Sequence, residues 1–273
     1  MGFERIAERG ILLIGCGKMG TAMMEGWLAA GLSPSSIHVR DPNPSPRLSS
    51  LAEQGLYLNA PLPAAPALCL IAVKPQMMGE ALPGIAALGG GPTLFLSIAA
   101  GITLAGFEAA LGANSPIIRA MPNTPAAIGR GITALIGNAA AGAAHLELAE
   151  QVLGTIGETV RLDDESQMDA VTAVSGSGPA YVFHLIDCLA AAGVAEGLPE
   201  ALAMRLAKAT VAGAGMLAMS ATETPEQLRI NVTSPKGTTE AGLVELMDPA
   251  KGLPPLIRRT VAAAARRSRE LAG

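Results

Sequence analysis

A glycine-rich turn near the start of the chain constrains the fold more than any other feature. Residues 11–14 are four apolar residues without alternation, which is typical of a strand buried on both faces of a parallel sheet. Gly15, Gly17 and Gly20 then form a G-x-G-x-x-G turn that opens a helical pattern over 19–30. Glycines at this spacing allow a tight turn and the close approach of a pyrophosphate to the helix N-terminus. The turn therefore predicts dinucleotide binding, with Lys18 and Met19 inside the binding loop.

An acidic residue ends the next predicted strand, which covers residues 37–41. Asp41 stands where the adenine ribose hydroxyls of a dinucleotide need a hydrogen-bond acceptor. Its charge fits a free 2′-hydroxyl and repels a 2′-phosphate, which favours NADH. Arg40 and Arg47 lie close by in the sequence and could instead hold that phosphate, which favours NADPH. The sequence leaves the choice between NADPH and NADH open.

Strands and helices alternate through the first part of the chain, which is typical of βαβ crossovers. Strands are predicted at 11–15, 37–41, 56–58, 68–73, 93–97, 116–120, 132–137 and 159–162. Helices are predicted between them at 19–30, 45–54, 76–87, 103–111 and 142–153. The fold class is therefore α/β, with an N-terminal Rossmann domain over 1–162 built on a doubly wound, mostly parallel sheet.

Helices alone follow residue 162, and they are rich in Ala, Leu and Met. They are predicted at 165–193, 199–220, 225–231, 238–247 and 253–270. We expect an all-α C-terminal domain over 163–273. Its helices carry more apolar faces than one bundle needs, and small residues such as Ala207 and Gly215 allow close helix approach, so packing against a second copy is favoured over packing within one bundle.

Composition excludes several classes of protein. The 273 residues carry a net charge of −4 and 3% aromatic residues, which does not suit nucleic-acid binding. Three cysteines and no ligand-spaced cluster predict free thiols and no metal site. No uninterrupted run of 18 apolar residues occurs, and Glu4 and Glu8 stand where a leader needs an apolar core. We expect a cytoplasmic protein that binds no membrane.

Candidate site loops follow the predicted strands, because ligands of open α/β sheets bind beyond the carboxyl ends of the strands. These loops are 72–76, 97–101 and 121–125. Lys74 in the first loop is either a catalytic base, a phosphate contact, or a solvated lysine whose backbone lines the cofactor.

The helical half contributes two loops rich in glycine and hydroxyl groups, 175–181 and 231–243. The second loop runs directly into a helix, so its backbone N–H groups and hydroxyls suit a carboxylate or phosphate. Together the two loops predict a pocket with many neutral donors and few ionisable groups.

The motifs of the chain, taken in order, resemble those of the pyrroline-5-carboxylate reductases from about Ile11 to Leu246. They are G-x-G-x-M-G at 15–20, A-V-K-P-Q at 72–76, S-x-A-A-G at 97–101, M-P-N-T-P at 121–125, D-A-V-T-x-x-S-G-S-G-P-A-Y at 169–181 and V-T-S-P-x-G-T-T-x-x-G-L at 232–243. The resemblance implies reduction of 1-pyrroline-5-carboxylate to L-proline by hydride transfer from NADPH or NADH. It also implies a Rossmann domain, a helical dimerisation domain, and a homodimer or a higher oligomer.

The resemblance further implies a role for individual residues. The substrate carboxylate would be held by Ser234 and by the backbone at Gly237 and Thr238, and the Thr239 hydroxyl would act in catalysis on the ring nitrogen. The residues implied to line the dinucleotide are Asn59, Ala72, Val73, Lys74, Pro75, Ile98, Ala99, Ala100 and Asn231. Neither proline feedback nor activity on six-membered imines can be read from the sequence.

Two positions depart from the family pattern. Lys236 stands where the family usually has a glycine or another small residue, so a positive φ there would strain the backbone. The Lys236 ammonium could equally attract the substrate carboxylate. Ile230 replaces the usual Asp and removes a charge beside the loop.

Two other functions compete with this interpretation. A β-hydroxyacid dehydrogenase shares the glycine turn but uses a helix lysine as acid and base. Lys208 is the candidate for that lysine, and Ala212 occupies the position where such enzymes have Asn. A protein that senses the nucleotide without catalysis is the other alternative.

Overall fold

The structure, a computed structural model, describes residues 2–272, and the chain forms two compact units. The first unit contains the residues up to Gly176 together with those from Ala265 onward, and the second contains Ser177–Ala264. The boundary predicted after residue 162 follows the last strand, whereas the compact units divide at Gly176 and Ala264. The chain therefore passes between the units twice.

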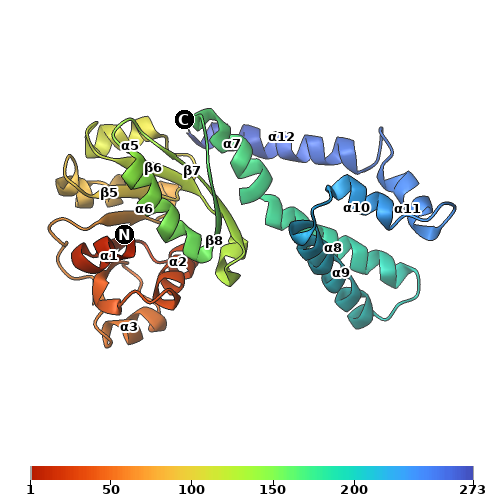
Figure 1. Ribbon diagram of the computed structural model, residues 1–273, viewed down its shortest axis with the longest axis horizontal. Helices are drawn as coiled ribbons and strands as arrows, with labels where there is room; N and C mark the ends of the chain where they lie inside the picture. The colour runs from red at the N-terminus through yellow and green to blue at the C-terminus, as the bar shows by residue number, and fades with distance from the viewer. Residues whose placement is uncertain (1, 273) are drawn as a thin grey trace. The chain divides into compact units, whose positions relative to one another are not determined.

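The first unit alternates strands and helices as the sequence predicts (Figure 1). Its elements are α1 (Gly2–Arg9), β1 (Ile11–Ile14), α2 (Lys18–Ala29), β2 (Ile37–Arg40), α3 (Pro46–Ala52), β3 (Tyr57–Leu58), β4 (Leu68–Ile71), α4 (Met78–Ala81), β5 (Leu94–Ser97), α5 (Leu104–Leu111), β6 (Ile117–Met121), β7 (Gly131–Gly137), α6 (Ala143–Leu153), β8 (Gly157–Arg161) and α7 (Met168–Val171). Helix α1 was not predicted. The predicted helix over 76–87 is wrong. The 3₁₀ turn Pro75–Met77, the short α4 and the 3₁₀ turn Pro83–Leu88 occupy this stretch, and a proline begins each 3₁₀ turn.

Eight strands form one sheet in the order β3-β2-β1-β4-β5-β6-β7-β8. All neighbouring strands are parallel except β6 and β7, which are antiparallel. This confirms the doubly wound, mostly parallel sheet. The strand order reverses between β1 and β4, the switch point beyond which ligands of such sheets bind.

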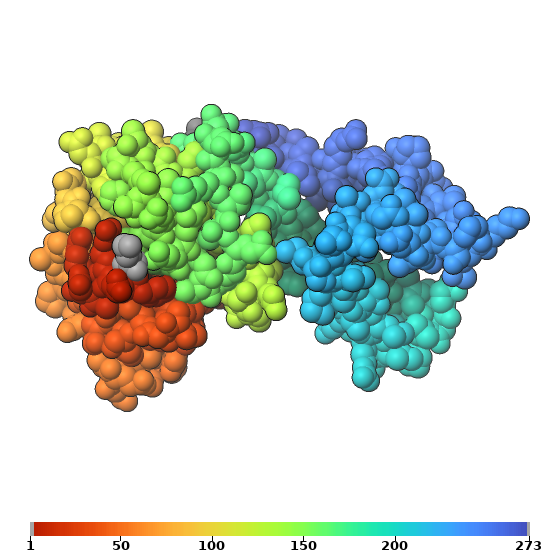
Figure 2. All heavy atoms as spheres, in the orientation of Figure 1, coloured from red at the N-terminus to blue at the C-terminus, as the bar shows by residue number. Residues whose placement is uncertain are grey.

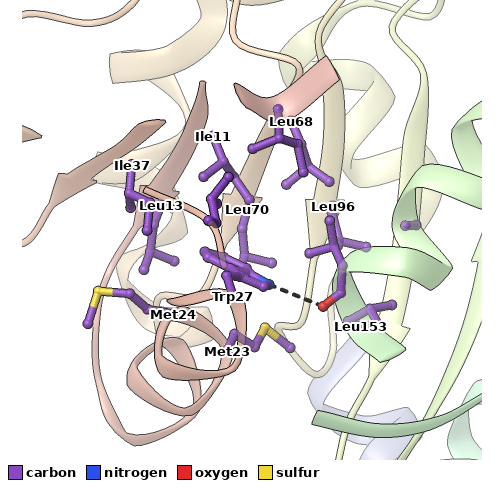
Figure 3. Close-up of a cluster of buried hydrophobic side chains, with 14 of the residues drawn as sticks. Ile11, Leu13, Met23, Met24, Trp27, Ile37, Leu68, Leu70, Leu96 and Leu153 are labelled. Atoms are coloured by element: carbon purple, nitrogen blue, oxygen red, sulfur yellow. Dashed lines mark hydrogen bonds between the residues drawn. The ribbon is translucent and has the colours of Figure 1, made fainter. Parts of the chain in front are cut away.

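Each face of the sheet carries its own buried core, because successive side chains of a strand point to opposite faces. Along β1, Ile11 and Leu13 join the core that contains α2 and α6, while Leu12 and Ile14 join the core under α5. Figure 3 shows Trp27 of α2 among the apolar side chains of the first core. The Trp27 indole N–H donates to the Val152 carbonyl at 3.1 Å and ties α2 to α6.

The second unit is entirely helical. Its elements are α8 (Gly178–Ala195), α9 (Glu200–Ser220), α10 (Pro225–Asn231), α11 (Thr238–Leu246) and α12 (Leu253–Ala272), and the end of α12 returns to the first unit. A π-helical segment, Thr172–Gly176, precedes α8 and interrupts the helix predicted over 165–193. The hydroxyls of Thr172 and Ser175 each donate to the carbonyl four residues earlier, which supports this widened turn.

Helices α8 and α9 pack against each other through small side chains. Ala190 of α8 and Ala203 and Ala207 of α9 are buried, and a Cβ at Gly193 would lie 3.3 Å from the Ala203 Cβ. Gly193 thus lets the two helices approach closely.

The large apolar side chains of α8 and α9 remain exposed, and the spheres of these helices lie on the visible surface of their unit (Figure 2). They include Val182, Phe183, Leu185, Leu189, Leu202, Leu206, Met216, Leu217 and Met219. The stretches Glu165–Ala195 and Glu200–Ser220 are long and apolar enough to cross a membrane, by length and composition only. Within the chain, 6% and 11% of their apolar windows are buried. Uncovered apolar surface of this extent marks an interface.

The end of α12 is fixed to the first unit by a hydrogen bond between residues distant in sequence. The buried Ser268 hydroxyl donates to Asp169 Oδ1 of α7 at 2.6 Å. Leu271, one turn later, places its carbonyl where a Cβ at Gly101 would lie 2.8 Å from it, so Gly101 is needed for this contact.

Replacing Ser268 tests the energetic weight of this attachment. Ser268→Ala should lower the free energy of unfolding by about 2 kcal/mol, the range of a hydrogen bond to a charged group. Chemical denaturation of the full chain measures the change. Ser49→Ala, which removes an exposed hydroxyl, is the matched control, and equal stabilities of the two variants would contradict the assignment.

Candidate functional site

The glycine turn after β1 has the backbone geometry that a dinucleotide requires. Gly15 has a φ of +83°, and a Cβ there would lie 2.7 Å from Val73 Cγ1. A Cβ at Gly20 would lie 2.7 Å from the Gly15 carbonyl, whereas one at Gly17 would meet no atom within 4 Å. The first and third glycines thus permit the turn, and the second leaves open space at the start of α2. No side chain caps this helix start, so its N–H groups are available to a pyrophosphate.

Asp41 is bound to the glycine turn. Its Oδ2 accepts the Cys16 N–H at 2.7 Å, and its Oδ1 accepts the Asn43 N–H at 2.8 Å. Asn59 holds Asp41 by the backbone, accepting the Asp41 N–H at 3.0 Å and donating to the Asp41 carbonyl at 2.9 Å. Asn59 itself has a φ of +52°, a conformation that Asn adopts more easily than most residues. Asp41 therefore occupies the predicted place and also fixes the turn.

Arg47, one of the two candidate phosphate ligands, is already paired. Its guanidinium forms a bidentate ion pair with Glu25 of α2, with distances of 2.6 and 3.0 Å. The hydrogen bond from Arg47 lowers the pKa of Glu25, which keeps that carboxylate charged. Arg40 is exposed at the end of β2.

Cys16 is the residue between the first two glycines, and its side chain is buried. Burial raises the pKa of its thiol, and the charges of Asp41 and Glu25 raise it further. Its sulfur lies 3.5 Å from the Thr21 hydroxyl, which donates to the Cys16 carbonyl at 3.1 Å. Cys16 is thus a packed, protonated thiol, as the sequence predicts.

The loops after β4 and β5 continue the same edge of the sheet. Ala72 donates its N–H to the Ile14 carbonyl at 2.8 Å, which holds the start of residues 72–75 beside the glycine turn. Lys74 is exposed in this loop. After β5, the buried Ser97 hydroxyl accepts the Ala99 N–H at 3.3 Å and shapes residues 98–100.

A partly buried ion pair lies beside the start of α5. Arg119 of β6 is paired with Glu165, whose Oε1 also accepts the Leu104 N–H at the start of α5. Neither Arg119 nor Glu165 was predicted from the sequence, because 46 residues separate them and neither belongs to a glycine or hydroxyl motif. Their charges are compensated within the network, so we assign them to structure.

The hydroxyl-rich loop of the second unit forms a tight turn into α11. The Gly237 N–H donates to the Ser234 carbonyl at 3.0 Å, with Pro235 and Lys236 in the middle of the turn. Helix α11 begins at Thr238 without a side-chain cap, so the first N–H groups of the helix remain available to an anion. Ser234, Thr238 and Thr239 are all exposed at this helix start. The turn thus gathers the four predicted substrate residues.

Lys236 has a φ of +59°. This is the left-handed conformation in which the sequence pattern predicts backbone strain. Proline before a residue of positive φ fits a type II turn, in which glycine is preferred at this position. Glu240 on the first turn of α11 compensates in part, since its Oε2 accepts the Lys236 N–H at 2.6 Å. Ile230, the other departure, is half exposed at the end of α10.

The first unit therefore brings together Gly15, Lys18, Asp41, Asn59 and the loops 72–75 and 98–100 at the carboxyl edge of the sheet. Asn231 belongs to the second unit, where its Oδ1 accepts a hydrogen bond from Gln227 at 2.8 Å. A backbone with open space at Gly17, uncapped N–H groups at α2 and an acceptor at Asp41 fits a dinucleotide.

Two family models match separate parts of the chain. The family model described as pyrroline-5-carboxylate reductase dimerisation matches residues 165–271. The model described as NADP oxidoreductase, coenzyme F420-dependent, matches residues 10–101. The glycine turn thus lies in the segment matched to a nucleotide-dependent family, and the loop before α11 in the segment matched to a dimerisation family.

Relatives cover nearly the whole chain. A pyrroline-5-carboxylate reductase of Pseudomonas aeruginosa is 40% identical over 265 residues, which is 96% of each chain. The chain belongs to the pyrroline-5-carboxylate reductase family. The structure of the Coxiella burnetii member matches with a TM-score of 0.88 at 31% identity, over 97% of this chain and 99% of that chain. The Plasmodium falciparum member, with NADP bound, matches with a TM-score of 0.84 at 26% identity, over 98% and 99%.

The strain at Lys236 is measurable with two substitutions. Lys236→Gly should be more stable than Lys236→Ala by about 1 kcal/mol, because alanine keeps the Cβ that disfavours positive φ. Both variants remove the ammonium and keep the N–H that Glu240 binds, so their difference isolates the backbone. Urea denaturation of the two variants compares them, and an alanine variant as stable as the glycine variant would show that the turn is unstrained.

Proposed function

We propose that this chain reduces 1-pyrroline-5-carboxylate to L-proline with NADPH or NADH, as the last step of proline biosynthesis. The single observation that carries the proposal is the turn at residues 234–239 into the uncapped start of α11, which offers an anion several neutral donors on a chain of this family. Bound at the glycine turn, the cofactor supplies a hydride for the imine carbon. The chain binds and orients the substrate and stabilises the charge that changes during transfer.

In this proposal the start of α11 holds the substrate carboxylate. The Ser234 hydroxyl and the Thr238 N–H donate to it, and the positive end of the helix dipole favours its charge. The Gly237 N–H donates to the Ser234 carbonyl at 3.0 Å within the turn. In this proposal the same N–H is a bifurcated donor that also contacts the carboxylate. No ionised side chain is needed for this contact, although the Lys236 ammonium adds attraction.

The Thr239 hydroxyl is the proposed catalytic group. It stands on the second residue of α11, one residue beyond the proposed carboxylate site, where it can hydrogen-bond the ring nitrogen. Reduction turns the imine nitrogen into an amine, and a hydroxyl can donate to or relay a proton to this atom. The proposed cofactor contacts are the glycine turn, Asp41, Asn59, residues 72–75, residues 98–100 and Asn231.

The functional division of the chain and its assembly are part of the proposal. We assign residues 1–162 to cofactor binding and residues 163–273 to dimerisation and substrate binding. The exposed apolar faces of α8 and α9 lie in the segment matched by the dimerisation family, so a second copy is the occupant that fits them, in a homodimer or a larger assembly. Covered in this way, both helices suit a protein of the cytoplasm without lipid or nucleic acid as a partner.

Replacing Thr239 tests its catalytic role. Thr239→Val keeps the shape and removes the hydroxyl, and should lower kcat by about 10- to 1,000-fold, the range of one hydrogen bond made in the transition state. Steady-state oxidation of NADPH or NADH with the imine measures kcat. Thr222→Val removes an exposed hydroxyl elsewhere in the same unit and serves as the control. A kcat equal to that of the control would remove Thr239 from the mechanism.

Replacing Ser234 should separate binding from catalysis. Ser234→Ala should mainly raise KM for the imine, because the carboxylate is bound alike in the ground state and the transition state. The same assay gives KM and kcat. A fall in kcat at unchanged KM would contradict the proposed carboxylate contact.

Substrate choice distinguishes this function from a β-hydroxyacid dehydrogenase. The wild-type chain should turn over pyrroline-5-carboxylate and leave 3-hydroxyisobutyrate unchanged with either cofactor. Tight cofactor binding without turnover of any imine would instead favour a nucleotide sensor.

A further inference from the structure

The place where the two forms of the cofactor differ is the 2′ position of the adenosine ribose. In Rossmann folds an acidic side chain after the second strand accepts from the free hydroxyl, and an arginine nearby accommodates a 2′-phosphate. This chain has both types of residue there. Asp41 follows β2, and Arg47 stands on the first turn of α3, after the Ser45 cap. The nucleotide preference therefore depends on where each of the two side chains is held.

Asp41 cannot turn away easily from the ribose position. Both of its carboxylate oxygens accept backbone N–H groups, from Cys16 at 2.7 Å and from Asn43 at 2.8 Å. Asn59 holds its backbone through two further hydrogen bonds. A 2′-phosphate would thus meet a negative charge that is fixed in place by four hydrogen bonds.

Arg47 is directed to another carboxylate. Glu25 of α2 holds it with two parallel hydrogen bonds of 2.6 and 3.0 Å. This fork geometry engages Nε and one terminal nitrogen, a pair of donors that could otherwise face a phosphate together. Asp41 accepts the Cys16 N–H of the glycine turn, and Glu25 lies on α2, the helix that this turn opens, so both carboxylates belong to the elements around the turn. A 2′-phosphate would lack a free Arg47 guanidinium and would meet the charge of Glu25 in addition to that of Asp41.

We propose that the Glu25–Arg47 ion pair, together with the fixed Asp41 carboxylate, makes this chain prefer NADH to NADPH, with Glu25 as the specificity-determining residue. The inference rests on the proposed cofactor site at the glycine turn. The pair is about half exposed, with side-chain accessibilities of 49% and 40%, so it is weak enough for one substitution to reverse its effect.

The test compares affinities for the two nucleotides in binding titrations that need no imine. Wild type should bind NADH about tenfold or more tightly than NADPH at low salt. Glu25→Gln frees the arginine and removes one negative charge, so its affinity for NADPH should rise about three- to tenfold relative to NADH, the range of one exposed charge-assisted contact. Adding Arg47→Ala to this variant should abolish the gain.

A matched control exists in the same unit. Glu150 and Arg161 form an ion pair of nearly the same geometry, with distances of 2.6 and 2.7 Å, on α6 and β8. Glu150→Gln changes the net charge as Glu25→Gln does, and should leave the NADPH to NADH ratio unchanged. Equal gains in both variants would assign the effect to net charge and overturn the proposal.

Other outcomes also decide the matter. A wild type that binds NADPH as tightly as NADH overturns the inference, as does a gain in Glu25→Gln that survives Arg47→Ala. Loss of NADPH binding in Arg40→Ala, with no effect of Glu25→Gln, would assign the phosphate contact to Arg40. If wild type bound neither nucleotide, the proposed cofactor site itself would fail. If wild type bound both nucleotides and Glu25→Gln left the ratio of their affinities unchanged, only the inferred preference would be refuted.

Discussion

The hydrogen bond from the Cys16 N–H to the Asp41 carboxylate is the interaction on which the cofactor half of the molecule depends. It joins the turn after β1 to the end of β2, while Gly15 donates to the Arg40 carbonyl and Ala72 donates to the Ile14 carbonyl. The ends of three neighbouring strands are thereby locked in one register. Because the side chain of Asp41 holds the turn, the N–H groups at the start of α2 are left for a ligand. One carboxylate thus fixes the turn and, in the proposed function, also recognises the ribose.

The contacts within the helical half bury mainly small side chains. Ala190, Ala203 and Ala207 lie between α8 and α9, and the leucines, methionines and Phe183 point outward. A helix pair of this kind buries little apolar area by itself, and burial is the main source of stability. The turn at residues 234–239, the proposed substrate site, is carried by this half. Covering the apolar surface with a second copy would therefore stabilise the half that carries this turn.

Much of the fold was predictable because a buried parallel sheet imposes unbroken apolar runs on its strands. The buried strands β1, β4 and β5 are such runs, and strands were predicted at all eight places where the sheet has one. Features set by distant contacts were not predictable. Arg47 is neutralised by a residue on another helix, and Ser268 meets Asp169 across 99 residues. The strain at Lys236 could be anticipated only as a condition, because a sequence does not reveal the sign of φ. The π-helical turn at Thr172–Gly176 escaped for a similar reason, since its residues fit an ordinary helical pattern.

The return of α12 to the first unit has a consequence for how the chain is completed during synthesis. The nucleotide-binding half is assembled from two separate pieces of the polypeptide, so it is completed only when the residues from Ala265 onward have been synthesised. A stop codon anywhere in the helical half would deprive Asp169 of its hydroxyl partner and leave Gly101 without the Leu271 backbone beside it. The helical segment is thus an insertion within the first unit. A chain that the ribosome releases inside this segment lacks the second piece of the first unit, so both units remain incomplete.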